Sequence, residues 1–338
     1  MIIRAHDATR LAWPTDWDRQ FGRSAPLHME IGFGNAQFLI DWAIREPQAN
    51  LIGIEISLPS IRKAESKIKN QKLTNTQVIH GNARLVLQSS LELETIDHLY
   101  INFPDPWHKA AHHHRKLIND QFLHLVATRM KPGGLLDIAT DDAGYQEVIT
   151  AALEQTPYFT SRTDETFATD DLERIRTKYE LKALAVGRTC KYYKWQRNDT
   201  VAENIFPIPQ ELDMPHAVLT DPLSFDEMSA RFSQQRYGGD TPVRLLRMYN
   251  SLTNDENQGT SLLVETHIAE DPLPQRVGLL IQKRTSGEIL IGCSELGFPR
   301  PTHGVHTAVA CLVHWILTLD PKTQVKHHNL NSPIPARS

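Results

Sequence analysis

An aspartate between two prolines is the most specific chemical signal in the sequence. Asp105 lies within Asn102-Phe-Pro-Asp-Pro-Trp-His-Lys109. Proline fixes the backbone dihedral φ at its own position and restricts the residue before it, so we expect Asp105 to project rigidly from an extended backbone. An ordinary turn does not need such rigidity. The pattern therefore predicts a functional role for the Asp105 carboxylate.

A glycine turn lies upstream, in Glu30-Ile-Gly-Phe-Gly-Asn35. Paired glycines such as Gly32 and Gly34 let the backbone approach a ligand closely. In a dinucleotide-binding turn a third glycine would occupy the position of Gln37, so this turn does not favour a pyrophosphate. It is either a structural glycine turn or a site for a nucleoside without a diphosphate, of which S-adenosylmethionine is a common example.

Two polar residues follow the next two expected strands. Glu55 ends the second strand, where an acidic residue binds ribose hydroxyls in this architecture, and both oxygens of its carboxylate can accept hydrogen bonds. Asn82 follows the third strand. Its amide suits an adenine edge, but it is equally placed to cap a helix that begins at Ala83. Both roles for Asn82 stay open and are compatible with each other.

A basic run follows the Pro-Asp-Pro segment and spans residues 108–116. We expect Lys109, Arg115 and Lys116 to meet phosphates there, although a solvated loop is the simpler alternative. Three consecutive histidines at 112–114 do not converge easily on one ion, and no carboxylate is spaced to join them. The three cysteines include no close pair, so we expect no metal.

Short apolar runs alternate with amphipathic stretches in the first part of the chain, which predicts βα units and a parallel sheet. Ligands are then expected at the carboxyl ends of the strands. The predicted fold class is α/β, a doubly wound, mostly parallel sheet followed by a second, smaller α+β domain. The expected strands are 27–31, 50–56, 76–80, 96–102, 135–140 and 190–197, and the expected helices are 36–45, 60–72, 83–90, 117–130 and 142–155.

A polar, proline-containing segment at 200–215 is the expected linker between a first domain, 1–199, and a C-terminal domain, 216–338. In the second domain we expect strands at 243–250, 261–268, 277–283 and 288–293, a hairpin turn at 285–287 and a buried helix at 307–319. Its role is not apparent from the sequence.

The composition is that of an ordinary globular protein, with 40% hydrophobic and 22% charged residues, and it excludes collagen, coiled coil and wholesale disorder. Residues 200–338 hold 11 Lys and Arg against 15 Asp and Glu, so the net charge of −4 belongs to that part. A phosphate-binding surface must therefore be a local cluster in the first part. With no secretory signal or membrane-spanning run, we expect a cytoplasmic location.

Several short motifs together resemble the tRNA (guanine-N7)-methyltransferase family over residues 27–197. They are EIGFG at 30–34, GIE at 53–55, FPDPWHK at 103–109, PGG at 132–134, ATD at 139–141, TKYE at 177–180 and Gly187-Arg188. The resemblance implies a class I methyltransferase fold with S-adenosylmethionine as the methyl donor, released as S-adenosylhomocysteine. It also implies tRNA as the partner, methylated on N7 of the variable-loop guanine at position 46.

The resemblance also implies roles for individual residues. It places Asp105 beside the donor and the target base as the catalytic residue. It places Glu30, Gly32, Gly34, Glu55, Asn82 and Asp105 at the methyl donor, and Lys109, Asp141, Thr177, Lys178, Tyr179 and Glu180 at the substrate. Asn82 stands where many family members have Asp, and Asn102 replaces an apolar residue. The region beyond about residue 200 has no recognised counterpart in the core family.

Guanine N7 has an in-plane lone pair and no proton, so its methylation needs placement of the base and no general base. An anionic Asp105 or Asp141 would favour the cationic product and accept hydrogen bonds from guanine N1–H and the amino group, which adenine lacks. Two alternatives stay open. One is a methyltransferase for another RNA or a small-molecule amino group; the other is a non-catalytic RNA-binding protein with a methyltransferase-like fold.

Overall fold

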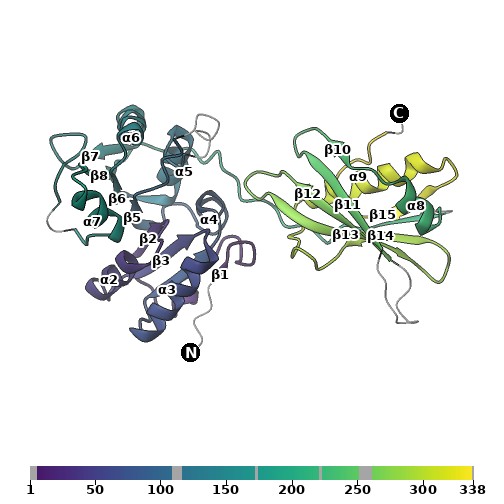
Figure 1. The fold of residues 1–338 in the computed structure, drawn as a ribbon, viewed down its shortest axis with the longest axis horizontal. Helices are drawn as coiled ribbons and strands as arrows, with labels where there is room; N and C mark the ends of the chain where they lie inside the picture. The colour runs from purple at the N-terminus through teal and green to yellow at the C-terminus, as the bar shows by residue number, and fades with distance from the viewer. Residues whose placement is uncertain (1–5, 109–115, 172–173, 221–222, 251–260, 337–338) are drawn as a thin grey trace. The chain divides into compact units, whose positions relative to one another are not determined.

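The computed structural model describes residues 6–336 except 109–115, 172–173, 221–222 and 251–260 (Figure 1). The chain divides into two compact units, Met1–Ile208 and Pro209–Ser338. The boundary falls within the segment expected as a linker.

Unit 1 is built around a sheet with strand order β1-β4-β3-β2-β5-β6-β8-β7. All neighbours as far as β6 are parallel, and β8 runs antiparallel to both β6 and β7. The strands are β1 (His6–Asp7), β2 (Leu27–Ile31), β3 (Asn50–Glu55), β4 (Thr76–His80), β5 (Ile96–Asn102), β6 (Met130–Thr140), β7 (Phe159–Ser161) and β8 (Lys191–Arg197).

The helices of unit 1 cover both faces of this sheet. Consecutive residues of β3 are therefore buried, although their side chains point to opposite faces. One layer contains α2 and α3, whose apolar faces share a core cluster with β3 and β4. In the other, α5 packs against α4 and α6. The helices are α1 (Trp17–Phe21), α2 (Gln37–Arg45), α3 (Leu58–Asn70), α4 (Ala83–Ser89), α5 (Asp120–Arg129), α6 (Ala143–Gln155) and α7 (Lys178–Ala185).

The prediction of a doubly wound, mostly parallel sheet of the class I methyltransferase type is confirmed. The predicted strand and helix ranges match the observed elements to within a few residues. One helix end differs, since α5 ends at Arg129 and β6 begins at Met130 instead of after the glycines. Pro132 disfavours a helical conformation for Lys131, so the helix ends before that residue. The sequence did not predict α7.

Unit 2 is an antiparallel sheet with order β10-β11-β12-β13-β14-β9-β15. Residues along β12 alternate between buried and half-buried, so the two faces of the sheet differ in coverage. The buried side chains share a core with α9. The elements are β9 (Ala217–Thr220), α8 (Phe225–Arg231), β10 (Gln235–Tyr237), β11 (Val243–Asn250), β12 (Ser261–Ile268), β13 (Gln275–Lys283), β14 (Ile289–Cys293), α9 (His303–Leu319) and β15 (Gln324–His328).

The α+β character of unit 2 and its four central strands are confirmed. The hairpin turn is present, because Gly287 N–H donates to the Arg284 carbonyl and Arg284 N–H donates to the Glu288 carbonyl. The expected buried helix begins four residues earlier, at His303. Within the described part of the chain, no helix combines the length and apolarity needed to cross a membrane.

Candidate active site

A buried carboxyl group lies at the carboxyl end of the central strand β2. The Glu30 side chain is 1% exposed, and burial raises its pKa to about 7. One carboxyl oxygen, Oε1, accepts a hydrogen bond from Asn102 Nδ2 at 3.0 Å. The other, Oε2, is buried and has no hydrogen-bond partner among the described residues. A buried oxygen of this kind is suited to a cationic or hydrogen-donating ligand.

Asn102 and Arg174 extend this site into a buried polar network. The Asn102 amide donates to Glu30 and accepts a hydrogen bond from Arg174 Nη2. The Arg174 side chain is 3% exposed, and its guanidinium lies 5.4 Å from the centre of the Phe38 ring and 5.5 Å from that of Tyr192. Asn102, a departure from the family pattern in the sequence, therefore joins a carboxyl group to an arginine.

The far end of the network organises helix α7. Glu180 is fully buried, and its Oε2 lies 3.6 Å from Arg174 Nε and accepts a hydrogen bond from Thr177 N–H at 3.2 Å. Thr177 Oγ1 in turn accepts one from Glu180 N–H, which completes a capping box. Tyr192 donates its hydroxyl to Glu180 Oε1 at 3.0 Å. Burial raises the pKa of Tyr192 and Glu180 raises it further, so the phenol stays protonated as the donor.

The glycine turn and Glu55 form the other wall of the site. Gly32 and Gly34 have φ of +74° and +53°, which favours glycine, and a Cβ at Gly32 would meet nothing within 4 Å. Glu55 Oε2 accepts a hydrogen bond from Gly34 N–H at 3.0 Å, and Oε1 accepts from the N–H groups of Ile56 and Ser57. Three of the roughly four acceptor positions of the carboxylate are thus occupied, which leaves one for a ribose hydroxyl.

Asn82 caps helix α4, which is one of the two roles predicted for it. Its side-chain oxygen accepts a hydrogen bond from Arg84 N–H at 2.8 Å. The side chain is exposed, so the cap leaves the amide accessible. Two exposed apolar side chains follow Glu55 and were not predicted from the sequence: Ile56 is 70% exposed and Leu58 is 51% exposed. An exposed apolar residue directly after Glu55 was the available signal, since such a side chain suits the face of a base.

The Pro-Asp-Pro segment is flanked by two residues in the left-handed region, Phe103 with φ of +50° and Trp107 with φ of +45°. Neither is glycine, so both backbones are strained, and such strain is concentrated at functional sites. Phe103 N–H donates to the Ala139 carbonyl at 2.8 Å, which anchors the start of the segment. Asp105 itself is exposed, and its charge helps to raise the pKa of Tyr145 to about 12, after the larger effect of burial.

Other predicted substrate residues lie around this segment. Asp141 Oδ2 lies 2.8 Å from Arg188 Nη1, an ion pair between two motifs that the sequence singled out. Lys116 Nζ lies 5.3 Å from the centre of the Tyr145 ring. Lys109, Arg115 and the three histidines lie outside the described residues.

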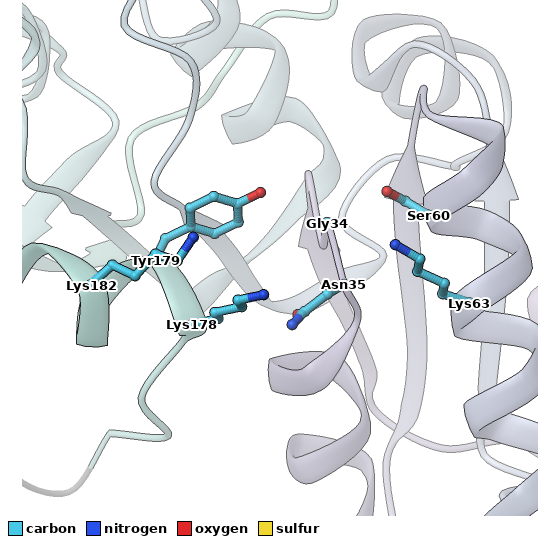
Figure 2. A pocket seen from close by; sticks show the side chains of 7 residues that line it. All are labelled: Gly34, Asn35, Ser60, Lys63, Lys178, Tyr179 and Lys182. Carbon is cyan, nitrogen blue, oxygen red and sulfur yellow. The ribbon is translucent and has the colours of Figure 1, made fainter.

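A small cavity opens beside the glycine turn (Figure 2). Its volume is about 170 Å³. Tyr179 forms one wall, and a Cβ at Gly34 would lie 3.5 Å from Tyr179 Cε2. We call it the lysine cavity, because Lys63 of α3 and Lys178 and Lys182 of α7 line it, together with Ser60 and Asn35.

The structure thus connects Glu30 with the TKYE segment through Asn102 and Arg174, and Glu55 with Gly34. The TKYE segment is divided, since Thr177 and Glu180 are turned inward to the capping box, whereas Lys178 and Tyr179 line the cavity. Sequence reasoning missed Arg174 and Lys63. For Arg174, the available signal was its position three residues before Thr177, the first residue of the capping box. No group of His, Cys, Asp and Glu among the described residues is arranged to hold a metal ion.

The chain is similar in sequence to proteins of one family. A protein family described as "Putative methyltransferase" matches residues 24–193. The tRNA (guanine-N(7)-)-methyltransferase of Thermus thermophilus is 30% identical over 303 residues, which are 89% of this chain and 92% of that protein. That alignment includes much of unit 2.

Other relatives match about half of the chain. The tRNA (guanine-N(7)-)-methyltransferase of Nitrosomonas europaea is 38% identical over 178 residues, which are 53% of this chain and 79% of that protein. Among solved structures, an antibiotic-related methyltransferase has 20% identity and a TM-score of 0.41, covering 55% of this chain and 96% of that one.

Proposed function

The chain belongs to the tRNA (guanine-N7)-methyltransferase family, and from this premise we propose that it methylates N7 of the guanine at position 46, in the variable loop of tRNA. The methyl donor of the family is S-adenosylmethionine. The observation that carries the proposal is the buried Glu30 carboxyl group with its orphaned Oε2, beside an open glycine turn and the Glu55 carboxylate.

The residues present fit this donor. S-adenosylmethionine carries an ammonium group, a ribose, an adenine and an electrophilic methyl group on a sulfonium. Glu30 would pair with the ammonium, which supplies the partner that Oε2 lacks. The remaining acceptor position of Glu55 would hold a ribose hydroxyl, and the exposed Ile56 would pack on the adenine. The exposed amide of Asn82 would meet the polar edge of that base.

The transfer of the methyl group to N7 needs little acid or base catalysis by the protein. The N7 lone pair forms a bond to the methyl carbon while the carbon–sulfur bond breaks and its electrons return to sulfur. The work of the chain is to hold the guanine in line with that bond. Exposed Asp105, on its strained segment, would accept hydrogen bonds from the guanine N1–H and amino groups and stabilise the cationic product.

Asp141 would need to exchange a partner to act in the same way. It is paired with Arg188, which is 62% exposed, so solvent weakens this ion pair and release of the carboxylate costs little. We infer that substrate binding separates Asp141 from Arg188.

Replacement of Asp105 tests the proposal. We expect Asp105→Ala to lower kcat/KM for tRNA by at least about a hundredfold while the protein stays folded. Asp164→Ala, which removes an exposed carboxylate from a loop after β7, is the matched control and should retain activity. Mass spectrometry of tRNA nucleosides measures 7-methylguanosine. Full activity of Asp105→Ala would refute the role of this residue.

The position of methylation is tested separately. A tRNA transcript with guanine 46 replaced by adenine should accept no methyl group, whereas the unaltered transcript should yield 7-methylguanosine. Methylation of the altered transcript would move the target to another guanine. Methyl groups in other nucleosides, or in small amines only, would contradict the proposed activity.

A further inference from the structure

The lysine cavity has the charge of an anion site. Lys63, Lys178 and Lys182 bring three ammonium groups to its lining, and no carboxylate lines it among the described residues. Within the same described part of the chain, none of the three lysines forms an ion pair. Like charges gathered at one small cavity repel each other, so a bound anion would relieve this repulsion. The sticks in Figure 2 show the lysines approaching from two separate helices.

A fourth cation fixes one wall of the cavity. Lys67 Nζ donates to the Asn35 carbonyl at 2.9 Å and to Gln37 Oε1 at 2.9 Å. Burial lowers the pKa of Lys67, against the opposing effect of Asp41, and the charge of Lys63 lowers it further. The two lysines are four residues apart on α3, which brings their side chains to one face of the helix. The ammonium group of Lys67 thus donates its hydrogen bonds to the protein, whereas those of the three lining lysines are available to a ligand.

Two helices begin at the cavity. Helix α3 starts at Leu58, and the side chain of its N-cap residue, Ser57, makes no capping hydrogen bond. Ser60, in the first turn, lines the cavity, and α7 begins at Lys178 on the opposite side. Helix N-termini carry partial positive charge and present N–H groups, so the uncapped start of α3 adds to the attraction for an anion, whereas the start of α7 is already capped by Thr177 and Glu180.

The size of the cavity limits the anion. A volume of about 170 Å³ is smaller than the roughly 300–1,000 Å³ of pockets that hold a whole drug-sized ligand. One compact group such as a phosphate fits these dimensions, whereas a nucleotide does not. The wall at Gly34 is shared with the donor site, because Gly34 N–H is bonded to Glu55.

We propose that the lysine cavity binds one backbone phosphate of the tRNA, close to the nucleotide that is methylated. This inference rests on the proposed function, since it takes tRNA as the substrate. Lys63 and Lys182 then act as phosphate-binding residues outside the motifs of the family resemblance. They would hold the nucleotide against the glycine turn and supply part of the local positive charge that the chain, with its net charge of −4, lacks overall.

The test compares two lysines of the same helix in the full-length protein. Lys63→Gln removes a charge from the cavity, and Lys69→Gln removes the same charge from α3 outside it. We expect Lys63→Gln to weaken tRNA binding and raise KM by about five- to tenfold and to reduce the slope of log affinity against log salt by about one. Lys182→Gln should behave like Lys63→Gln, and Lys69→Gln like the unaltered protein.

The measurements are fluorescence anisotropy with labelled tRNA over a series of KCl concentrations, steady-state methyl transfer, and calorimetry with S-adenosylmethionine. The loss should fall on KM, with donor affinity unchanged and 7-methylguanosine still the product. Equal tRNA affinities and salt slopes for Lys63→Gln and Lys69→Gln would overturn the inference. A fall in the affinity for S-adenosylmethionine alone would also overturn it, because the cavity would then bind the carboxylate of that methyl donor. Failure of the unaltered protein to form 7-methylguanosine would instead refute the proposed function.

Discussion

Glu30 is the most deeply buried carboxyl group of the candidate donor site. Its carboxyl group is buried at the end of β2, has one partner in Asn102, and has a pKa near neutrality because burial disfavours its charged form. A cationic ligand beside Oε2 would favour ionisation. At the residue scale the site is therefore a carboxyl group that is stabilised fully only when a ligand is bound.

The pH dependence of the stability of the unliganded protein should reveal the free-energy cost of ionising the buried Glu30 carboxyl group. In the folded state the pKa of Glu30 is about 7, against an ordinary value of 4.5, so the folded state binds more protons than the unfolded state between these values. Stability is therefore retained below about pH 4.5, falls as pH rises from there to about 7, by about 3 kcal/mol at most, and levels off above that value. Glu30→Gln does not titrate and should escape this loss.

Urea unfolding of both proteins at pH 5, 6, 7 and 8 measures the difference. Five of the six tryptophans lie in unit 1, so tryptophan fluorescence reports mainly on that unit. The advantage of Glu30→Gln over the unaltered protein should grow from pH 5 to about pH 7 and then level off. Parallel stability curves would show that Glu30 is not the titrating group.

Helix α7 is the element that joins the buried network to the lysine cavity. Its inward residues, Thr177 and Glu180, are held by the capping box and by Tyr192, and its outward residues, Lys178 and Tyr179, line the cavity. One short helix therefore transmits the position of Glu180 to the surface that we assign to the tRNA. Its placement depends on the cap, because eight residues are too few for a helix that is stable alone.

Removal of the cap should loosen α7 specifically. Thr177→Ala deletes the acceptor for Glu180 N–H and should destabilise the helix by about 1 kcal/mol. Amide hydrogen exchange within α7 should become faster, and KM for tRNA should rise. Ser224→Ala removes the equivalent capping box of α8 in unit 2 and is the matched control. Unchanged exchange in α7 of the Thr177→Ala protein would contradict this role.

At the scale of the whole molecule, the segment between the two units belongs structurally to both. Asn204 and the Phe206 carbonyl accept hydrogen bonds from the buried guanidinium of Arg129, so this stretch packs on unit 1. Beyond the boundary, Leu212 N–H donates to the Pro301 carbonyl and Glu211 pairs with Arg300, so the next stretch packs on unit 2. The expected linker is thus mostly ordered, with the boundary between Ile208 and Pro209.

Truncation should distinguish these stretches. A protein ending at Ile208 keeps every partner of Arg129 and should fold and bind S-adenosylmethionine. A protein ending at Asp199 leaves buried N–H groups of Arg129 unsatisfied, at a cost of about 1–3 kcal/mol, and also exposes the core around Phe206. Thermal unfolding of the two truncated proteins measures the difference. Equal melting temperatures would contradict the assignment of residues 200–208 to unit 1.

The sequence by itself determined six of the strands in the sheet of unit 1, the order of the motifs along the chain and their place at the strand ends, but not the short strands β1 and β7. Strands such as 27–31 and 50–55 are short apolar runs between amphipathic helices, and this local periodicity decides which element forms. A parallel sheet then brings the carboxyl ends together, which placed Glu30, Glu55 and the Pro-Asp-Pro segment at one edge. These properties depend on neighbours in the chain, so they are visible without coordinates.

Only the tertiary structure decided the contacts between distant parts of the chain. Asn102 bridges Glu30 and Arg174, and Lys63 meets Lys178 at one cavity, although 115 residues separate the two lysines in the sequence. No local pattern encodes such pairs, because they follow from how helices pack on the sheet and from which buried polar groups must find partners. The sequence showed which residues could take part in the chemistry, and packing selected those that meet.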